Sequence, residues 1–256
     1  MSELVVERDG AVLRVTFNRP ERRNAMTWAM YEGLVAACEA VDSDPGIRVL
    51  VLTGAGDQAF VAGTDIDQFL EFSTGADGVA YEEKMAAILD RLAAVRVPVV
   101  AVVRGYCVGA GLAIASVCDL RIVGRSARFG IPIARTVGNC LSMPVYSLLV
   151  SHFGPARTLD LLLRARLLSA EEADAAGFLT ELCADDEVAA KADETVERLL
   201  THAPLSMWAA KEAVRRLRTA SLPDGADIVA AVYGSDDFKA GVRAFVGKQR
   251  AEWKGR

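Results

Sequence analysis

The chain has 256 residues, of which 52% are hydrophobic and 25% are charged. This length and composition exclude a disordered chain and predict one large hydrophobic core, in one domain with at most a helical appendage. The formal net charge of −5, with no long basic run, argues against nucleic acid as a main partner.

The cysteines and the N-terminal segment point to an intracellular compartment. The five cysteines are odd in number and show no CxxC spacing, so we expect reduced, mostly buried thiols and no metal site. No apolar segment is long enough to span a membrane, and no basic stretch followed by an apolar run opens the chain. We therefore expect a cytoplasmic protein with no membrane partner.

The N-terminal third begins with a predicted hairpin and a helix. Two β-type runs at Leu4–Val6 and Val12–Phe17 flank Asp9–Gly10, a turn sequence that favours antiparallel pairing. Thr27 is the expected N-cap of a helix, because apolar residues after it recur at a spacing that lines one helix face.

A strand, helix and strand follow, and then the pattern becomes helical. Ile47–Leu52 and Val97–Val103 are continuous apolar runs, typical of parallel strands covered on both faces. Met85–Val95 has a helical period, so a right-handed crossover joins the two strands. After about residue 140 we expect helices at roughly 142–153, 155–163, 169–176, 187–203, 204–220 and 236–249. The pattern predicts an α/β fold.

Two glycine-containing loops, Gly54–Ile66 and Gly105–Gly111, leave predicted strands at their carboxyl ends, where open α/β sheets bind ligands. The second loop runs into an apolar helix at Leu112–Val117, so its free amides and positive dipole end should face a pocket. Such amides suit an oxyanion. The alternative is that these glycines only allow tight turns and close packing.

A dinucleotide-binding loop is a further alternative. Gly54–Ala59 matches the G-x-G-x-x-A fingerprint. However, Phe60–Gly63 follows in place of a long helix, and no acidic residue ends a second strand at the usual distance. We therefore set this interpretation aside.

A series of motifs then extends over essentially the whole chain. They are residues 18–20 and 23–26, 59–66, 105–111 with 118–120, 127–132, 154–157, 169–173 and 244–248. In this order they resemble the enoyl-CoA hydratase/isomerase (crotonase) family. The resemblance implies a crotonase-like spiral of ββα turns over residues 1–195. It further implies a C-terminal helical trimerisation region over 196–256, and a homotrimer or homohexamer.

The resemblance also implies an acyl-CoA substrate and the residues that hold it. The backbone amides of Thr64 and Ala110 would form the oxyanion hole, and coenzyme A would enter as part of the substrate, with no cofactor bound covalently. Phe245 and Lys248 would approach the nucleotide from a neighbouring subunit. The implied coenzyme A contacts are Arg23, Ala25, Ala59, Ala62, Asp65, Ile66, Phe245 and Lys248. For Asp65, satisfying nearby backbone N–H groups is an alternative role.

The chain departs from the family pattern at its acid–base positions. Family hydratases use two glutamates, and the corresponding positions here are Ala113 and Ile133. Neither side chain can transfer a proton, and such groups contribute about 10²–10⁴ each to rate. We therefore do not expect efficient hydration by the standard route.

The loop after Ile133 carries polar residues at the expected acyl end. We hypothesise that Arg135 or Asn139 orients a polar acyl group; the alternative is that Arg135 pairs with a carboxylate elsewhere and Asn139 caps a helix near Ser142. Three functions stay open: an enoyl-CoA hydratase or isomerase, another acyl-CoA reaction such as decarboxylation or thioester hydrolysis, and a non-catalytic acyl-CoA-binding subunit.

Overall fold

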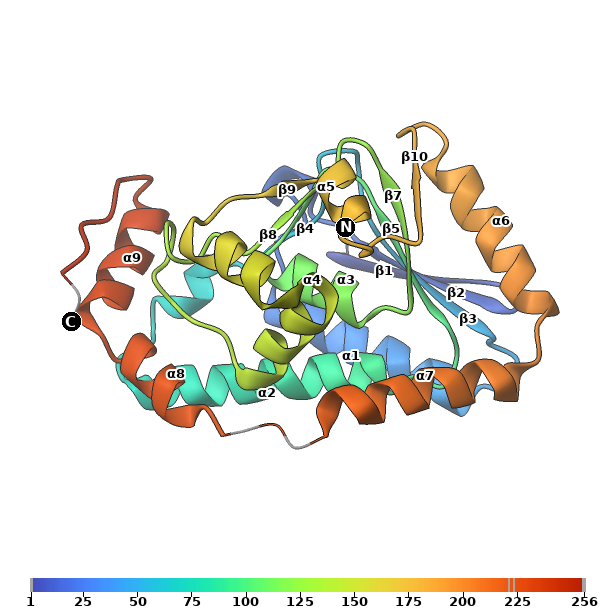
Figure 1. Cartoon of the computed structure of the whole chain (residues 1–256), viewed down its shortest axis with the longest axis horizontal. Helices are drawn as coiled ribbons and strands as arrows, with labels where there is room; N and C mark the ends of the chain where they lie inside the picture. The colour runs from blue at the N-terminus through green and yellow to red at the C-terminus, as the bar shows by residue number, and fades with distance from the viewer. Residues whose placement is uncertain (1, 221, 223, 255–256) are drawn as a thin grey trace.

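The computed structural model of the chain describes residues 2–220, 222 and 224–254. Residues 1 and 255–256, at the ends of the two predicted regions, and residues 221 and 223 lie outside it. The fold is the predicted α/β type, with two sheets at the centre and helices around them (Figure 1). The predicted boundary at residue 195 falls within one helix, α6 (Val188–Thr201).

The larger sheet has the strand order β1-β2-β3-β5-β7-β10. The predicted hairpin is present, and it is the only antiparallel pair of this sheet among the described residues. The two apolar runs pair in parallel as β3 and β5, as the crossover predicts. The bounds are β1 Leu4–Asp9, β2 Val12–Phe17, β3 Val49–Gly54, β5 Val99–Val103, β7 Leu120–Gly124 and β10 Glu181–Cys183.

The smaller sheet has the order β4-β6-β8-β9, and sequence patterns did not reveal it because its strands are only two to four residues long. The strand β9 is antiparallel to β8, and the other pairs are parallel. The bounds are β4 Ala59–Ala62, β6 Tyr106–Val108, β8 Arg128–Gly130 and β9 Leu168–Ser169.

Each turn of the chain contributes one strand to each sheet and then a helix, in the orders β3-β4-α2, β5-β6-α3 and β7-β8-α4. This confirms the expected spiral of ββα turns. Thr27 caps α1 as predicted, its Oγ1 accepting the Met30 amide. The first helices are α1 Trp28–Ser43, α2 Gly75–Ala93, α3 Ala110–Val117 and α4 Met143–Leu163, with short 3-10 turns at Pro20–Arg22 (η1) and Ile66–Phe69 (η2).

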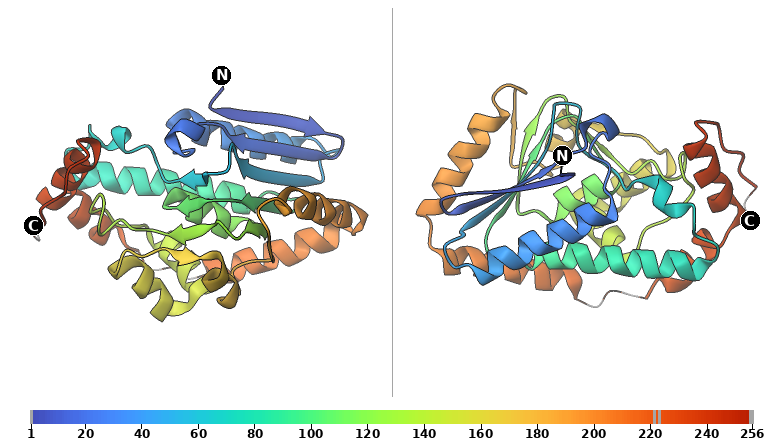
Figure 2. Two further views of the ribbon diagram at one scale, coloured as in Figure 1. Left: turned by 90° about the horizontal axis from the view of Figure 1, so that it is seen from above. Right: turned by 180° about the vertical axis from the view of Figure 1, so that it is seen from behind.

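The C-terminal helices follow the predicted spacing, with one addition. The helices expected at 142–153 and 155–163 form the two arms of α4, which bends at Gly154. Helix α8 was not expected. The bounds are α5 Ala170–Ala175, α6 Val188–Thr201, α7 Pro204–Thr219, α8 Ala226–Tyr233 and α9 Asp236–Val246. Figure 2 shows that α6 and α9 lie at opposite ends of the molecule.

Candidate functional site

The two glycine loops meet because the strands before them are parallel neighbours. In the β4–β6 pair, Ala62 lies opposite Val108, so the residues after each strand leave the sheet side by side. A Cβ added to Gly109 would lie 3.3 Å from the Gly63 Cα. The predicted convergence of the two loops is therefore present.

Glycine is required at both turns and at the helix that follows. Gly63 and Gly109 have φ values of 99° and 57°, a region that L side chains rarely adopt. A Cβ on Gly111 would lie 2.1 Å from the Val61 carbonyl oxygen, so only glycine lets α3 approach β4 this closely. These glycines therefore both allow close packing of α3 on β4 and shape the loops whose backbone amides are exposed.

The amides of Thr64 and Ala110 are free. Within the part of the chain that the structure describes, neither donates a hydrogen bond to another protein atom. Ala110 is the first residue of α3, so its N–H also lies at the positive end of a helix dipole. Two such donors side by side can stabilise negative charge on one oxygen atom.

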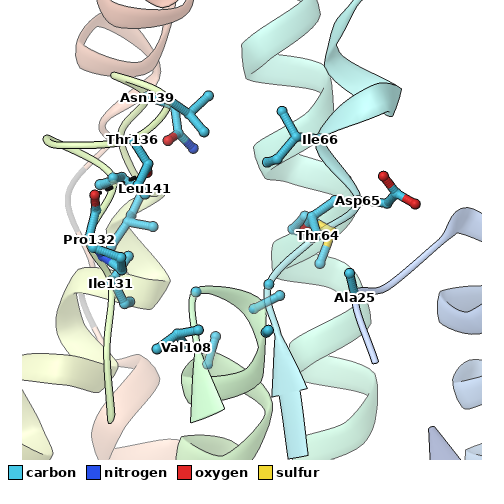
Figure 3. Close-up of a pocket in the computed structure, with 18 of the residues that line it drawn as sticks. Ala25, Thr64, Asp65, Ile66, Val108, Ile131, Pro132, Thr136, Asn139 and Leu141 are labelled. Atoms are coloured by element: carbon cyan, nitrogen blue, oxygen red, sulfur yellow. Dashed lines mark hydrogen bonds between the residues drawn. The ribbon is translucent and has the colours of Figure 1, made fainter. Parts of the chain in front are cut away.

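These amides border a cavity of about 440 Å³ (Figure 3). In the close-up, Thr64 and Ile66 lie on one wall, and Pro132, Asn139 and Leu141 on the other. The lining ranges from exposed side chains to buried ones. The exposed members include Arg22, Arg23, Tyr106 and Phe245, and the buried members include Tyr81, Glu82, Met85, Leu89, Ala113, Ile131, Val137 and Val145.

Most of the predicted coenzyme A contacts line this cavity, namely Arg23, Ala25, Ala62, Asp65, Ile66 and Phe245. Two do not. Ala59 is buried and its carbonyl accepts the Asn24 amide group at 2.7 Å, whereas Lys248 is exposed beyond α9 and outside the lining. Phe245 lines the cavity of its own chain, and its approach to the nucleotide of a neighbouring subunit stays a prediction. At the exposed side, the Arg23 guanidinium lies 5.1 Å from the centre of the Tyr106 ring.

Two polar residues fix the segments around the cavity. Asn24 is fully buried and donates to the carbonyls of Ala55 and Ala59, so it anchors the loop before β4. Asp65 forms a 2.9 Å ion pair with Arg19 and accepts the Asp67 amide as the N-cap of η2. Asp65 therefore does satisfy the backbone, the alternative role expected for it.

The Thr64 side chain is held by two tyrosines that sequence reasoning did not single out. Its hydroxyl lies 2.8 Å from the Tyr31 hydroxyl and 2.9 Å from that of Tyr81. Burial raises the pKa of both phenols, so both keep their protons at neutral pH. The result is a rigid anchor for the residue that presents one of the free amides.

Both positions that carry glutamate in family hydratases face the cavity, as Ala113 and Ile133. Neither side chain can act as an acid or a base. Asn139 lines the cavity too, but Arg135 is exposed and outside the lining. Asn139 does not cap α4, whose N-cap is Ser142; its Nδ2 donates to the Tyr233 hydroxyl at 3.1 Å.

One carboxyl in the cavity wall was missed. Glu82 of α2 is only 5% exposed, and it accepts the Tyr233 hydroxyl at 2.8 Å and the Ser142 amide at 2.7 Å. Burial raises the pKa of this carboxyl, and these hydrogen bonds offset the rise in part. A signal existed in the sequence, because Glu82 falls on the helix face that carries Met85 and Leu89.

The described residues hold no group of three or more His, Cys, Asp or Glu side chains arranged to bind a metal. Nor does any helix among them have the length and apolar character needed to cross a membrane. All five cysteines are buried and unpaired.

Two sheets wound as ββα turns, with free amides at the ends of β4 and β6, define the crotonase class of α/β protein. The sequence model of the enoyl-CoA hydratase/isomerase family matches residues 7–256. The chain therefore belongs to the enoyl-CoA hydratase/isomerase family, and the resemblance noted in its sequence is confirmed.

Individual relatives align with this chain over nearly their full length. The chain is 31% identical over 260 residues to 2,3-dehydroadipyl-CoA hydratase of Escherichia coli (strain K12), covering 100% of both chains. It matches the structure of an enoyl-CoA hydratase/carnithine racemase from Magnetospirillum magneticum with a TM-score of 0.81 and 32% identity, over 100% of this chain and 97% of that one. A methylmalonyl-CoA decarboxylase structure shares the fold, with a TM-score of 0.90 at 22% identity over 100% and 99% of the two chains. Together these support an acyl-CoA enzyme of the crotonase family.

Proposed function

We propose that this enzyme stabilises the enolate of an acyl-CoA thioester between the backbone amides of Thr64 and Ala110. The observation that carries the proposal is that both amides are free and leave adjacent parallel strands beside the cavity. An enolate oxygen carries more negative charge than the thioester carbonyl from which it forms. Preorganised donors therefore bind it more strongly than they bind the substrate, which lowers the barrier.

We propose that coenzyme A lies along the exposed side of the cavity as part of the substrate. Arg22 and Arg23 supply positive charge there, which suits phosphate groups, and Phe245 offers an exposed ring. Ala25 and Ile66 line the space between these residues and the free amides. Ala59 and Lys248 have no part in this arrangement within one chain.

For the acyl end we propose that Asn139, and not Arg135, orients a polar group of the substrate. Asn139 lines the cavity, and its Nδ2 is already engaged by Tyr233. Its buried Oδ1 has no hydrogen-bond partner among the described residues. A buried acceptor without a partner is costly, so a hydroxyl or amide donor on the acyl group would gain by meeting it.

The reaction that completes the cycle follows from what stands at the glutamate positions. Hydration by the two-glutamate route requires carboxyl groups that Ala113 and Ile133 do not supply. Decarboxylation is the second candidate, because loss of CO₂ from a malonyl-type thioester forms an enolate without a base. Isomerisation and thioester hydrolysis use the same hole. Enoyl-, malonyl- and 3-hydroxyacyl-CoA thioesters, followed by mass spectrometry, separate these reactions from binding without turnover.

We also propose that the enzyme assembles as a homotrimer or homohexamer through its C-terminal helices. Helix α7 has no buried residue, yet it carries apolar side chains that a partner copy would cover: Leu205, Trp208, Val214 and Leu217.

The amide of Ala110 can be tested directly because it opens a helix. Proline is tolerated at the first helical position, so Ala110→Pro removes the N–H without interrupting α3. A 3-oxoacyl-CoA bound as its enolate has an ultraviolet absorbance band. We expect this band to be lost in Ala110→Pro, and turnover to fall about 10²–10³-fold. Ala110→Gly keeps the N–H and should keep both signals. An undiminished enolate band in Ala110→Pro would contradict the proposal.

A further inference from the structure

The cavity wall contains two carboxyl groups, and only one is available for proton transfer. Asp65 is committed to its ion pair with Arg19 and to capping η2. Glu82 has no such cation: none of the ion pairs among the described residues includes it. Its two contacts are the neutral donors Tyr233 and the Ser142 amide.

The surroundings of Glu82 favour a carboxyl that can both take and return a proton. The titratable groups that act on it come from several elements, and all are neutral acids: Tyr31 of α1, Tyr81 of α2, Cys140 before α4, Tyr146 of α4 and Tyr233 of α8. Without a neighbouring positive charge, burial destabilises the charged form of Glu82. An upward shift of the pKa moves a carboxyl towards the range in which it can act as both a general acid and a general base.

The position of Glu82 also connects it to the free amides. Its neighbour Tyr81 contacts the Thr64 hydroxyl at 2.9 Å, and both Glu82 and Thr64 line the same cavity. The Asn139–Tyr233–Glu82 hydrogen-bond chain fixes the carboxyl against α8 and the loop before α4. Ala113 and Ile133, which would otherwise supply the acids, leave this part of the wall apolar.

We infer that Glu82 is the catalytic acid–base of this enzyme, moving a proton to and from the carbon next to the thioester carbonyl. The inference rests on the proposed enolate chemistry. In one direction the carboxylate takes the proton, the C–H electron pair forms the C=C bond of the enolate, and the carbonyl electrons move to the oxygen held by the amides. In reverse, the carboxylic acid returns the proton to carbon, and no oxidant or further reactant is required.

Hydrogen exchange in D₂O tests this step without knowledge of the full reaction. The full-length protein is incubated with butanoyl-CoA and hexanoyl-CoA, and deuterium at the carbon beside the carbonyl is followed by mass spectrometry. We expect Glu82→Gln to slow exchange at least about 10²-fold while the Kd for the thioester stays within about twofold. Glu83→Gln, at the adjacent exposed position, is the matched control and should exchange at the wild-type rate.

Tyr233→Phe separates a catalytic role from a structural one. Loss of the Tyr233 hydroxyl removes a donor that lowers the pKa of Glu82, so the rise of the exchange rate with pH should move to higher pH. In Glu82→Gln that rise should disappear. If Glu82 were purely structural, both variants would exchange at altered rates, but the pH dependence of exchange would not move. The shift in Tyr233→Phe tests the catalytic role of Glu82 even if Glu82→Gln does not fold.

The outcomes distinguish this inference from the proposed function. Wild-type exchange rates in Glu82→Gln, together with loss of exchange in Ala110→Pro, would remove Glu82 from the mechanism and keep the oxyanion hole. Full exchange in Ala110→Pro, with loss of exchange in Glu82→Gln, would support Glu82 as the acid–base and contradict the oxyanion hole. Tight binding of both thioesters by the wild type without any exchange would overturn the role of Glu82.

Discussion

Among the buried polar side chains, Asn24, Glu82 and Arg121 each find hydrogen-bond partners. Arg121 is 8% exposed and ties several segments together, because its guanidinium donates to the carbonyls of Phe178, Ala115 and Cys118. His152 lies beside it and contacts the Ser116 carbonyl at 2.8 Å through Nε2. The Cys140 thiol likewise finds a backbone partner, the Ile228 carbonyl.

His152 should make stability depend on pH. Burial, followed by the charge of Arg121, lowers the pKa of this imidazole to about 4 from an ordinary value of about 6.5. As the pH falls from about 6.5 to about 4, the unfolded chain gains a proton that the folded one does not. The free energy of unfolding should therefore decline over this range, by roughly 2–3 kcal/mol.

Urea denaturation between pH 7 and pH 4 measures this decline. His152→Gln should reduce the dependence of the free energy of unfolding on pH, whereas His202→Gln, at the exposed second histidine, should leave this dependence unchanged. If the free energy of unfolding depended on pH equally in His152→Gln and wild type, His152 would not be the cause of the decline.

At the scale of elements, glycines in α2 decide where α8 docks and hence where Tyr233 lies. A Cβ on Gly78 would lie 2.1 Å from the Tyr233 Cβ, and one on Gly75 would lie 2.1 Å from the Ala230 carbonyl oxygen. Gly78 is also one turn before Glu82. The close approach of the two helices is what brings the Tyr233 hydroxyl to the Glu82 carboxyl.

Gly78→Ala should therefore disturb both stability and the carboxyl. We expect a loss of about 1–3 kcal/mol in the free energy of unfolding, since the added methyl forces α8 away. The pH profile of exchange should move as in Tyr233→Phe. In the matched variant Gly33→Ala, within α1, the methyl meets only the end of the Leu4 side chain, so stability should be unchanged or higher. A stable Gly78→Ala protein would contradict this account of helix docking.

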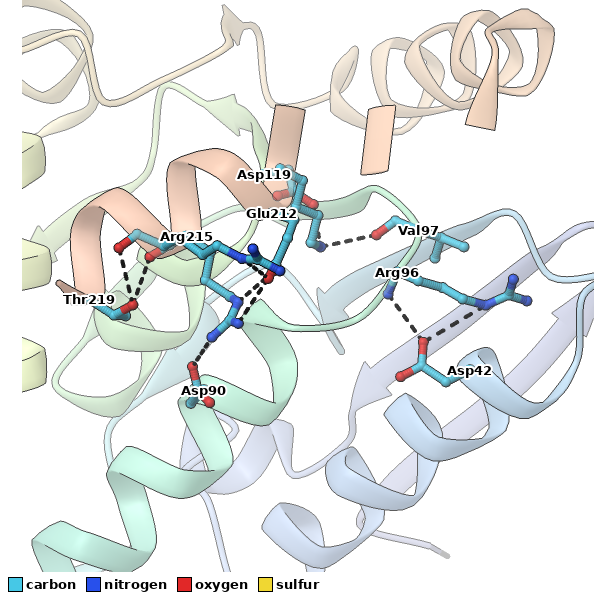
Figure 4. Close-up of polar contacts among 10 residues, drawn as sticks. Asp42, Asp90, Arg96, Val97, Asp119, Glu212, Arg215 and Thr219 are labelled. Carbon is cyan, nitrogen blue, oxygen red and sulfur yellow. Dashed lines mark hydrogen bonds and ion pairs between the residues drawn. The ribbon is translucent and has the colours of Figure 1, made fainter. Parts of the chain in front are cut away.

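At the scale of the whole molecule, α7 is attached to the rest of the chain by polar contacts. The Lys211 ammonium bonds the Asp119 carboxylate at 2.7 Å and the Val97 carbonyl at 3.0 Å, and the Arg215 guanidinium bonds Asp90 of α2 at 3.0 Å (Figure 4). The apolar residues of α7 are left outward, with Leu205 78% and Leu217 81% exposed. Several exposed apolar side chains on one helix are typical of a subunit interface.

Substitution on that surface should change the mass of the particle and not the fold. We expect wild type to sediment as a trimer or hexamer, and Leu205→Glu/Leu217→Glu to shift it towards the monomer with an unchanged circular dichroism spectrum. Leu163→Glu, at an equally exposed position ending α4, is the control and should leave the assembly intact. A monomeric wild type would contradict the proposed assembly.

The sequence alone was sufficient for the family, through motifs in a fixed order, and for the strand–helix–strand core and the two glycine loops, through apolar periodicity and turn residues that are readable without contacts. The ββα spiral followed only from the family resemblance, because the strands of the smaller sheet are two to four residues long. Ala113 and Ile133, which the sequence singled out, line the cavity.

Only the tertiary structure decided which polar residues share that cavity. Asn139, Tyr233 and Glu82 are far apart in the chain, and they meet because α8 packs across the glycines of α2. Arg135 and Lys248 lie outside the lining, whereas Phe245 of α9 is part of it. Contacts of this kind depend on how helices pack against each other, which the residues of any one helix do not specify.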